Sequence, residues 1–171
     1  VEGLPGGGLP PAPYAVLHAC PGGFRSGLKQ WPLERWAEVA AHLSRRGLAV
    51  LLSGGPADRA GNAELARLAV ERGAEVTDLS GVRVGPTALL LKHAALCVSV
   101  NTGIMHLAAA MGAPLVSLNG PVSVERWGPV TAPFSDTKGE ALRSKRSCAP
   151  CLHLGFEYAC AEGGCMADIG A

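Results

Sequence analysis

This 171-residue sequence lacks the features that mark several other classes of protein. Its formal net charge is only +1 and it has no basic block, so we expect no nucleic-acid partner. No apolar run reaches the ~18 residues that a transmembrane helix needs. The N-terminus lacks the basic-then-apolar pattern of a signal peptide. These absences predict a soluble, cytoplasmic protein without a transmembrane segment.

Two common nucleotide-binding signatures are also missing. The glycine-rich loop at 20–31 lacks the GxxxxGK[ST] spacing of a P-loop, and no GxGxxG follows the first predicted strand. An NAD-dependent dehydrogenase is therefore poorly supported. The chain has the length of one ordinary domain, which can bury a core without a disulfide or a metal.

Residues 1–13 are unusually rich in glycine and proline, with Gly6-Gly7-Gly8 in the middle of the stretch. Such a composition disfavours regular structure, so we predict a linker or an exposed loop without a helix or strand. A linker here would imply a preceding domain. A disordered natural terminus is the alternative.

From residue 14 onward, short apolar runs alternate with segments of helical periodicity. The runs predict buried strands at 14–19, 48–53, 76–79, 96–100 and 115–118, and helices lie between them. This order, without hairpin signals, predicts a doubly wound parallel sheet, a Rossmann-like α/β fold. The pattern fades after Gly120. We assign 14–147 to this domain and 148–171 to a cysteine-rich tail packed on or beside it.

Right-handed crossovers place every strand-to-helix loop of such a sheet on one edge, where ligands bind. The loops at 20–31, 54–58 and 101–103 are therefore the candidate site. In the last of these, Asn101 or Thr102 can cap the following helix, and Gly103 allows close approach to the backbone. Free amides in that first turn, together with His106, would suit a diphosphate. An ordinary capped helix with a half-buried histidine is the alternative.

The other two loops each supply one charged candidate. Lys29 follows a glycine-rich stretch and can neutralise phosphate charge when a nucleoside diphosphate leaves. Asp58 lies just past a strand end, where a carboxylate can accept hydrogen bonds from ribose hydroxyls. The alternatives are a solvated surface lysine and an aspartate that simply caps the next helix.

Taken together and in order, these segments resemble the C-terminal domain of the ADP-heptose:lipopolysaccharide heptosyltransferase family. The resemblance covers roughly 14–130. The segments that carry it are Pro21-Gly22-Gly23, Lys29-Gln30-Trp31-Pro32, Gly54-Gly55-Pro56, Leu79-Ser80-Gly81, Asn101-Thr102-Gly103-Ile104-Met105-His106-Leu107-Ala108-Ala109-Ala110, Asn119-Gly120-Pro121 and Arg126-Trp127-Gly128-Pro129.

The resemblance implies the donor-binding half of an inverting GT-B glycosyltransferase that acts in lipopolysaccharide core synthesis. By position, Lys29 would lie near the donor phosphates and sugar, Thr102, Gly103 and His106 at the diphosphate, and Asp58 near the ribose. The donor would be a nucleotide sugar such as ADP-heptose, with no metal or other cofactor. The lipid A–core acceptor and the catalytic base would belong to an N-terminal domain absent from this chain. We therefore expect the chain alone to be inactive, and the full-length protein to associate peripherally with a membrane.

One residue departs from the family pattern, because Asn101 stands where the family usually has aspartate. Asparagine keeps the shape of a capping side chain but loses the negative charge. The donor preference or the activity can therefore differ from the family's.

Four of the six cysteines form a separate cluster, Cys148-x2-Cys151-x8-Cys160-x4-Cys165. Zinc binding, disulfides and unligated thiols all fit this spacing. Cys20 and Cys97 lie in or beside predicted strands, and we expect both to be buried thiols. A second functional hypothesis follows, a non-catalytic nucleotide-binding or zinc-stabilised interaction module with a degenerate site.

Overall fold

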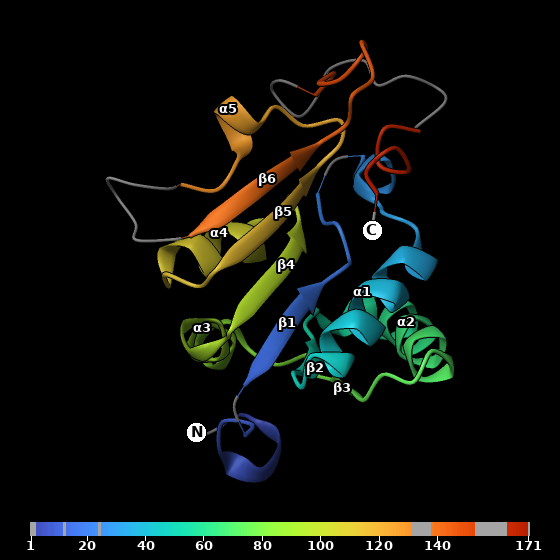
Figure 1. Cartoon of the computed structure of the whole chain (residues 1–171). Helices are drawn as coiled ribbons and strands as arrows, with labels where there is room; N and C mark the ends of the chain where they lie inside the picture. Colours follow the sequence, from blue (N-terminus) through green and yellow to red (C-terminus); the bar gives the residue numbers. More distant parts are fainter. Residues whose placement is uncertain (1–2, 12, 24, 131–137, 153–163, 171) are drawn as a thin grey trace.

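The computed structural model describes residues 3–11, 13–23, 25–130, 138–152 and 164–170. A six-stranded parallel sheet runs in the order β3-β2-β1-β4-β5-β6 (Figure 1). The strands are Tyr14–His18 (β1), Ala49–Leu52 (β2), Val76–Asp78 (β3), Leu96–Val100 (β4), Leu115–Asn119 (β5) and Gly139–Arg143 (β6). The predicted doubly wound, Rossmann-like α/β fold is confirmed.

Helices connect the strands, and all but the last of them follow the predicted periodicity. They are Leu33–Arg45 (α1), Arg59–Glu71 (α2), Val84–His93 (α3), Gly103–Ala110 (α4) and Val124–Trp127 (α5), with short 3₁₀ turns at Pro5–Gly7 (η1), Ser26–Lys29 (η2) and Pro56–Asp58 (η3). Gly47 and Gly73 follow the ends of α1 and α2 with φ of 81° in each case. This left-handed conformation costs glycine nothing, which explains why both helices end there.

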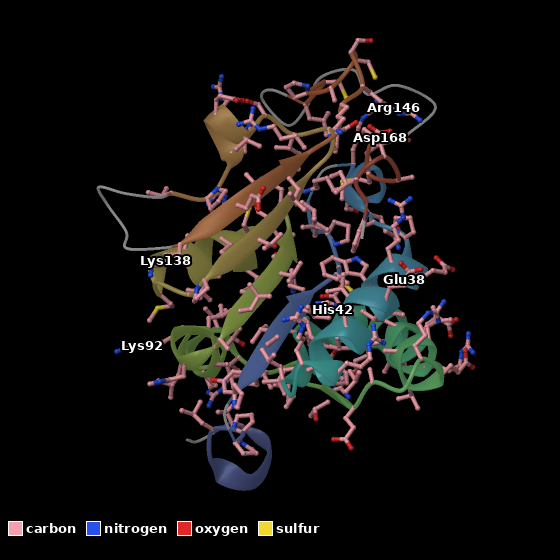
Figure 2. The ribbon with its side chains drawn as sticks, viewed as in Figure 1. Glu38, His42, Lys92, Lys138, Arg146 and Asp168 are labelled. Atoms are coloured by element: carbon pink, nitrogen blue, oxygen red, sulfur yellow. The ribbon has the colours of Figure 1, made fainter. Side chains whose placement is uncertain are left out.

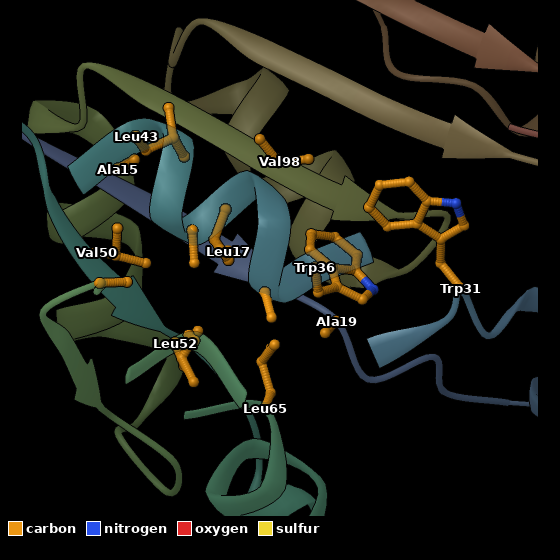
Figure 3. Packing of buried hydrophobic residues seen from close by; sticks show 14 of the residues in the cluster. Ala15, Leu17, Ala19, Trp31, Trp36, Leu43, Val50, Leu52, Leu65 and Val98 are labelled. Atoms are coloured by element: carbon orange, nitrogen blue, oxygen red, sulfur yellow. The ribbon is translucent and has the colours of Figure 1, made fainter. Parts of the chain in front are cut away.

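Side chains of β1 alternate between two hydrophobic clusters, one on each face of the sheet. Leu17 is fully buried on the face that α1 and α2 cover, in one cluster with Trp36 of α1 (Figure 3). Tyr14 is buried on the opposite face, and its hydroxyl donates a hydrogen bond to the Leu90 carbonyl of α3 at 2.9 Å. The core therefore lies in two layers, with the central strands between them.

The carboxyl ends of β1 and β4 lie side by side, because Leu17 pairs with Val98 and His18 with Ser99. From these neighbours the chain departs to opposite faces: α1 packs with α2, and α4 packs with α3 (Figure 1). The loops after β1 and β4 therefore diverge from one point, the topological switch at which ligands bind in such sheets.

The N-terminal stretch differs from its prediction in one respect. It contains η1, and Leu4 beside it is only 7% exposed and packs in the cluster that holds Tyr14. The expectation of no regular element was wrong, because the apolar side chain of Leu4 packs into the core and holds this stretch against the domain. Residues 1, 2 and 12 lie outside the described part of the chain.

The sequence periodicity also missed β6, which pairs in parallel with β5. Glu140 and Arg143 are exposed on this edge strand, and its other side chains are at most half-buried. An edge strand shares only one side with the sheet, so it needs no continuous apolar run. The sequence also gives no sign of helix α5, because four residues are too few to show a helical period.

Strands β4 to β6 border a hollow on the face that carries α1, which we call the face groove. It has a volume of about 560 Å³, and its lining is Trp31, Glu38, Val39, His42, Leu43, Arg45, Leu96, Val98, Val116, Leu118, Leu142 and Gly170. Most of these side chains are aliphatic and extend the core cluster. Among the described residues, no helix is both long enough and apolar enough to cross a membrane.

Candidate functional site

A second hollow, which we call the edge pocket, lies at the carboxyl ends of β1 and β4. It has a volume of about 640 Å³. Its lining is His18, Cys20, Pro21, Gly22, Asp58, Val84, Thr102, Gly103, Ile104, His106, Leu107 and Ala110. Four of the six residues predicted from sequence, Asp58, Thr102, Gly103 and His106, therefore share one pocket.

The first turn of α4 forms one wall of the pocket. Thr102 occupies the position before the helix, but neither it nor Asn101 makes a side-chain cap, so that prediction was wrong. Instead, the Thr102 Oγ1 atom is buried without a hydrogen-bond partner among the described residues. Uncapped amides at a helix N-terminus carry partial positive charge and bind anions. His106 lies on the same turn, and partial burial lowers its pKa.

Lys29 lies beside the pocket rather than in its lining. Its Nζ atom donates hydrogen bonds to the carbonyl oxygens of Gly22 at 2.6 Å and Asn101 at 3.5 Å. The ammonium group therefore joins the loop after β1 to the loop after β4. Burial lowers the pKa of Lys29 from its ordinary value. The cation thus stands at the junction of the two loops that frame the pocket.

The Asn101 side chain is buried and does not line the pocket. Its Nδ2 atom lies 3.0 Å from Asn119 Oδ1 and 2.6 Å from the Trp127 carbonyl oxygen. These bonds tie the end of β4 to β5 and α5. In this structure, Asn101 contributes to the site through its backbone carbonyl, which accepts from Lys29, and through the position it gives to Thr102.

Asp58 lines the pocket and also closes η3. Its Oδ2 atom accepts a hydrogen bond from the Gly55 amide at 2.7 Å. The capping alternative is therefore present, although at η3 rather than at α2. The two roles are compatible, because a carboxylate can accept several hydrogen bonds.

Sequence reasoning missed His18, the last residue of β1. It is only 6% exposed, and its Nδ1 atom lies 3.0 Å from Ser53 Oγ and 3.2 Å from the Ser53 carbonyl oxygen. Burial lowers the pKa of His18, against smaller opposite effects of the Ser53 carbonyl, the Asp58 charge and the Cys20 carbonyl. A signal was available, because a histidine that ends a buried parallel strand must lie at the ligand-binding edge.

Cys20 also differs from expectation. Its thiol is half-buried and lines the pocket, whereas Cys97 is fully buried as predicted. Burial, with smaller contributions from Asp58 and Asp78, raises the pKa of Cys20 to about 11. The thiol is therefore protonated near neutral pH, and its Sγ atom donates to Asn62 Oδ1 at 3.6 Å.

In the C-terminal tail, Cys148 is exposed, Cys151 half-buried and Cys165 buried. The described residues contain no cluster of three or more His, Cys, Asp or Glu side chains able to hold a metal ion. The remaining cysteine of the predicted cluster, Cys160, lies outside the described residues. For the cluster, zinc binding, disulfides and unligated thiols therefore stay predictions.

A Rossmann-like sheet with an uncapped helix N-terminus at its switch point is typical of nucleotide-binding domains. The family comparison makes the class specific. Residues 10–161 match the model of glycosyltransferase family 9 (heptosyltransferase), and the chain belongs to this family.

Curated relatives agree with that assignment. The chain is 35% identical over 153 residues to lipopolysaccharide heptosyltransferase 1 of Pseudomonas aeruginosa, covering 87% of this chain and 39% of the relative. It is 36% identical over 118 residues to lipopolysaccharide heptosyltransferase 2 of Escherichia coli, covering 68% of this chain and 34% of the relative. The chain thus spans little more than a third of the length of these enzymes.

A solved structure described as E. coli heptosyltransferase WaaC with ADP has the same fold. The TM-score is 0.65 at 28% identity, covering 80% of this chain and 40% of that one. E. coli ADP-heptose lps heptosyltransferase II gives a TM-score of 0.60 at 33% identity, covering 76% and 38%. The resemblance inferred from sequence is confirmed at the level of family and fold.

Proposed function

We propose that this chain is the donor-binding part of a heptosyltransferase and that its edge pocket holds the nucleoside diphosphate of a nucleotide sugar, with ADP-heptose as the expected donor. One observation carries the proposal. The uncapped N-terminus of α4 and the imidazole of His106 meet in one pocket, which Thr102 also lines. Such a set of donors suits the diphosphate oxygens. The WaaC structure with ADP supports the choice of base.

Lys29 would neutralise charge that develops on the leaving diphosphate, and Asp58 would accept from the ribose. This charge compensation comes from protein groups, so the proposal requires no metal. The position of Lys29 supports this proposed role, because Lys29 bridges the two loops that border the pocket.

The remaining steps of the reaction belong to the longer enzyme. We propose that a lipid A–core acceptor and the catalytic base lie in a second domain that closes over the edge pocket. This chain alone would then bind donor without transferring sugar. The reaction would take place on the cytoplasmic side of a membrane, with peripheral association of the full-length protein. Detectable transfer to a lipid acceptor by this chain would contradict this part.

Calorimetric titration with ADP, UDP and GDP, without added metal, tests the proposal. We expect selective binding of ADP. Because charge-assisted contacts are worth ~1–3 kcal/mol, His106→Ala and Lys29→Ala should each weaken that binding roughly 5- to 150-fold. Selective binding of UDP or GDP would mean that the donor carries a different nucleotide, while the proposed site would stand.

Two residues outside the site provide matched controls. His42 lies on α1 in the lining of the face groove, and Lys92 lies in the last turn of α3 (Figure 2). His42→Ala and Lys92→Ala remove the same side-chain types and should leave ADP affinity unchanged. If all four variants bound ADP with the affinity of the wild-type chain, the proposed site would be wrong.

A further inference from the structure

The turn that carries Lys29 has little packing of its own to hold it in place. It belongs to the loop 20–30 between β1 and α1, and none of the described residues of that loop is buried. The first buried side chain after the loop is Trp31, which is 2% exposed and follows Lys29 by two residues. Because buried contacts are what order a loop, Trp31 is the nearest fixed point from which the position of Lys29 is set.

Trp31 is held in turn by the C-terminal segment 164–170, which we call the brace. Its indole Nε1 atom donates a hydrogen bond to the Ile169 carbonyl oxygen at 3.0 Å. Arg35 of α1 donates to the same oxygen, which has two lone pairs and can accept both bonds. The Trp31 ring also packs edge to face on Trp36, with 5.2 Å between the ring centroids (Figure 3). The indole bond thus ties the loop of Lys29 to the brace.

The brace is fastened to the ends of β5 and β6. Met166 is 1% exposed, and a Cβ atom added at Gly120 would lie only 2.5 Å from its Sδ atom, so the brace packs directly on the backbone after β5. Asp168 (Figure 2) accepts hydrogen bonds from the Ser144 hydroxyl and the Lys145 amide, both at 3.0 Å, just past β6. The brace therefore has a defined position relative to the sheet.

Lys29 lies at the other end of this series of contacts. Its bond to the Asn101 carbonyl, at 3.5 Å, is at the outer limit of hydrogen-bond length. A small displacement of the loop would break that bond and move the ammonium group away from the loop after β4. The position of Lys29 at the edge pocket is thus sensitive to its anchor at Trp31.

We propose that Trp31, held by the brace, is a positioning residue for Lys29, so that the C-terminal segment controls how strongly the edge pocket binds a diphosphate. The inference rests on the function proposed above, because it affects the donor only if Lys29 faces the donor phosphates. It gives a part in donor binding to a segment that does not line the edge pocket.

A double-mutant cycle measured by calorimetry tests the inference. Trp31→Phe keeps an aromatic ring and removes the Nε1 donor, so ADP binding should weaken roughly two- to fivefold. In the Lys29→Ala chain the same substitution should have no further effect, because the residue through which Trp31 acts is gone. Trp36→Phe is the matched control. The Trp36 Nε1 atom has no partner among the described residues, so its loss should leave ADP affinity unchanged.

Asp168→Ala tests the same route without altering the core. It releases the brace from β6 and should weaken ADP binding by a similar factor, again only when Lys29 is present. Glu71→Ala is its control, because that exposed carboxylate pairs with Arg67 on α2. Melting curves verify that each variant is folded.

A second measurement needs no nucleotide, and it follows the pKa of Lys29 by NMR in the ligand-free chain. The signal is the one that Lys29→Arg removes. Burial lowers this pKa in the wild type. Trp31→Phe and Asp168→Ala should raise it toward its ordinary value, because a displaced ammonium group is better hydrated.

The outcomes separate this inference from the proposed function. Absence of ADP binding by the wild-type chain would overturn both. If both variants keep the wild-type affinity, or lose it equally with and without Lys29, the positioning role is wrong while the diphosphate site stands. A loss of affinity without a change in the pKa of Lys29 would also overturn the role, because Trp31 would then act on another part of the pocket.

Discussion

Two hollows of similar volume lie on this domain, and they differ in what surrounds them. The edge pocket is bounded by loops, by one side of α4 and by the start of α3, and its lining includes two imidazoles, a carboxylate and a thiol. The face groove is bounded by α1 and strands β4 to β6, and its lining is mostly leucine and valine. The volumes are about 640 and 560 Å³, so size does not distinguish them.

The difference follows from where each hollow stands in the fold. At the carboxyl edge, strand pairing ends and backbone amides lose their partners, so polar groups can point toward a ligand. On the sheet face, the backbone groups are already paired in the ladder, and the strands present only aliphatic side chains to the groove. We therefore expect ligand recognition at the edge, while the strands in the groove continue the core. Three substitutions and one mapping experiment test this division.

Leu43 lines the face groove and is 8% exposed within the core cluster. Leu43→Ala should lower the free energy of unfolding by about 2–5 kcal/mol, the usual cost of truncating a buried leucine. Urea denaturation measures this loss. ADP affinity at low temperature, where the variant stays folded, should equal that of the wild type. A parallel loss of affinity would mean that the two hollows are coupled.

Substitution of Gly103, in the edge pocket, should have the opposite effect and lower ADP affinity without lowering stability. A Cβ atom added there meets no atom within 4 Å, and its φ is not positive, so the fold tolerates alanine. We expect Gly103→Ala to keep or slightly raise the stability, by up to ~1 kcal/mol. ADP affinity should fall at least ~10-fold, because the methyl group would stand where we propose that the diphosphate approaches the helix amides.

Gly85 is the matched control for this substitution. It lies in α3, a Cβ there also meets nothing within 4 Å, and it does not line the edge pocket. Gly85→Ala should change stability to a similar extent without affecting ADP. An unchanged affinity in Gly103→Ala would place the diphosphate elsewhere.

Thr102 should give the smallest effect of the three. Its Oγ1 atom is buried and unpartnered, so Thr102→Val should leave the stability unchanged or raise it by ~1 kcal/mol. ADP affinity should fall ~3- to 10-fold, because a rotation of the Thr102 side chain would let its hydroxyl donate to the phosphate in the proposed complex. Thr87→Val is the control. Its hydroxyl bonds the Arg83 carbonyl at 3.0 Å, so stability should fall without a change in affinity.

The comparison also explains what the sequence could predict. Buried central strands such as β1 and β4 are predictable because they are apolar runs, and the glycines after α1 and α2 mark the helix ends. The topology rule then brought Asp58, Thr102, Gly103 and His106 to one edge. No periodicity marks β6, because only one of its sides pairs with the sheet.

The roles of individual side chains were harder to predict. Asn101 was expected at the pocket, but it turns inward to Asn119 and Trp127, contacts that depend on the paths of β5 and α5. His18 was overlooked within an apolar run, although its place at the strand end puts it in the pocket. The direction in which such a side chain points, and the groups that it contacts, can be known only from the three-dimensional packing.

The most direct test of the division is to map ADP onto the ¹⁵N-labelled chain by NMR titration. The account predicts that the largest chemical-shift changes occur at the amides of Gly22, Gly103 and His106. Signals from Val98 and Val116, in the face groove, should change little. Saturable shifts centred on the groove, or none anywhere at millimolar ADP, would contradict the claim that the edge pocket binds the nucleotide.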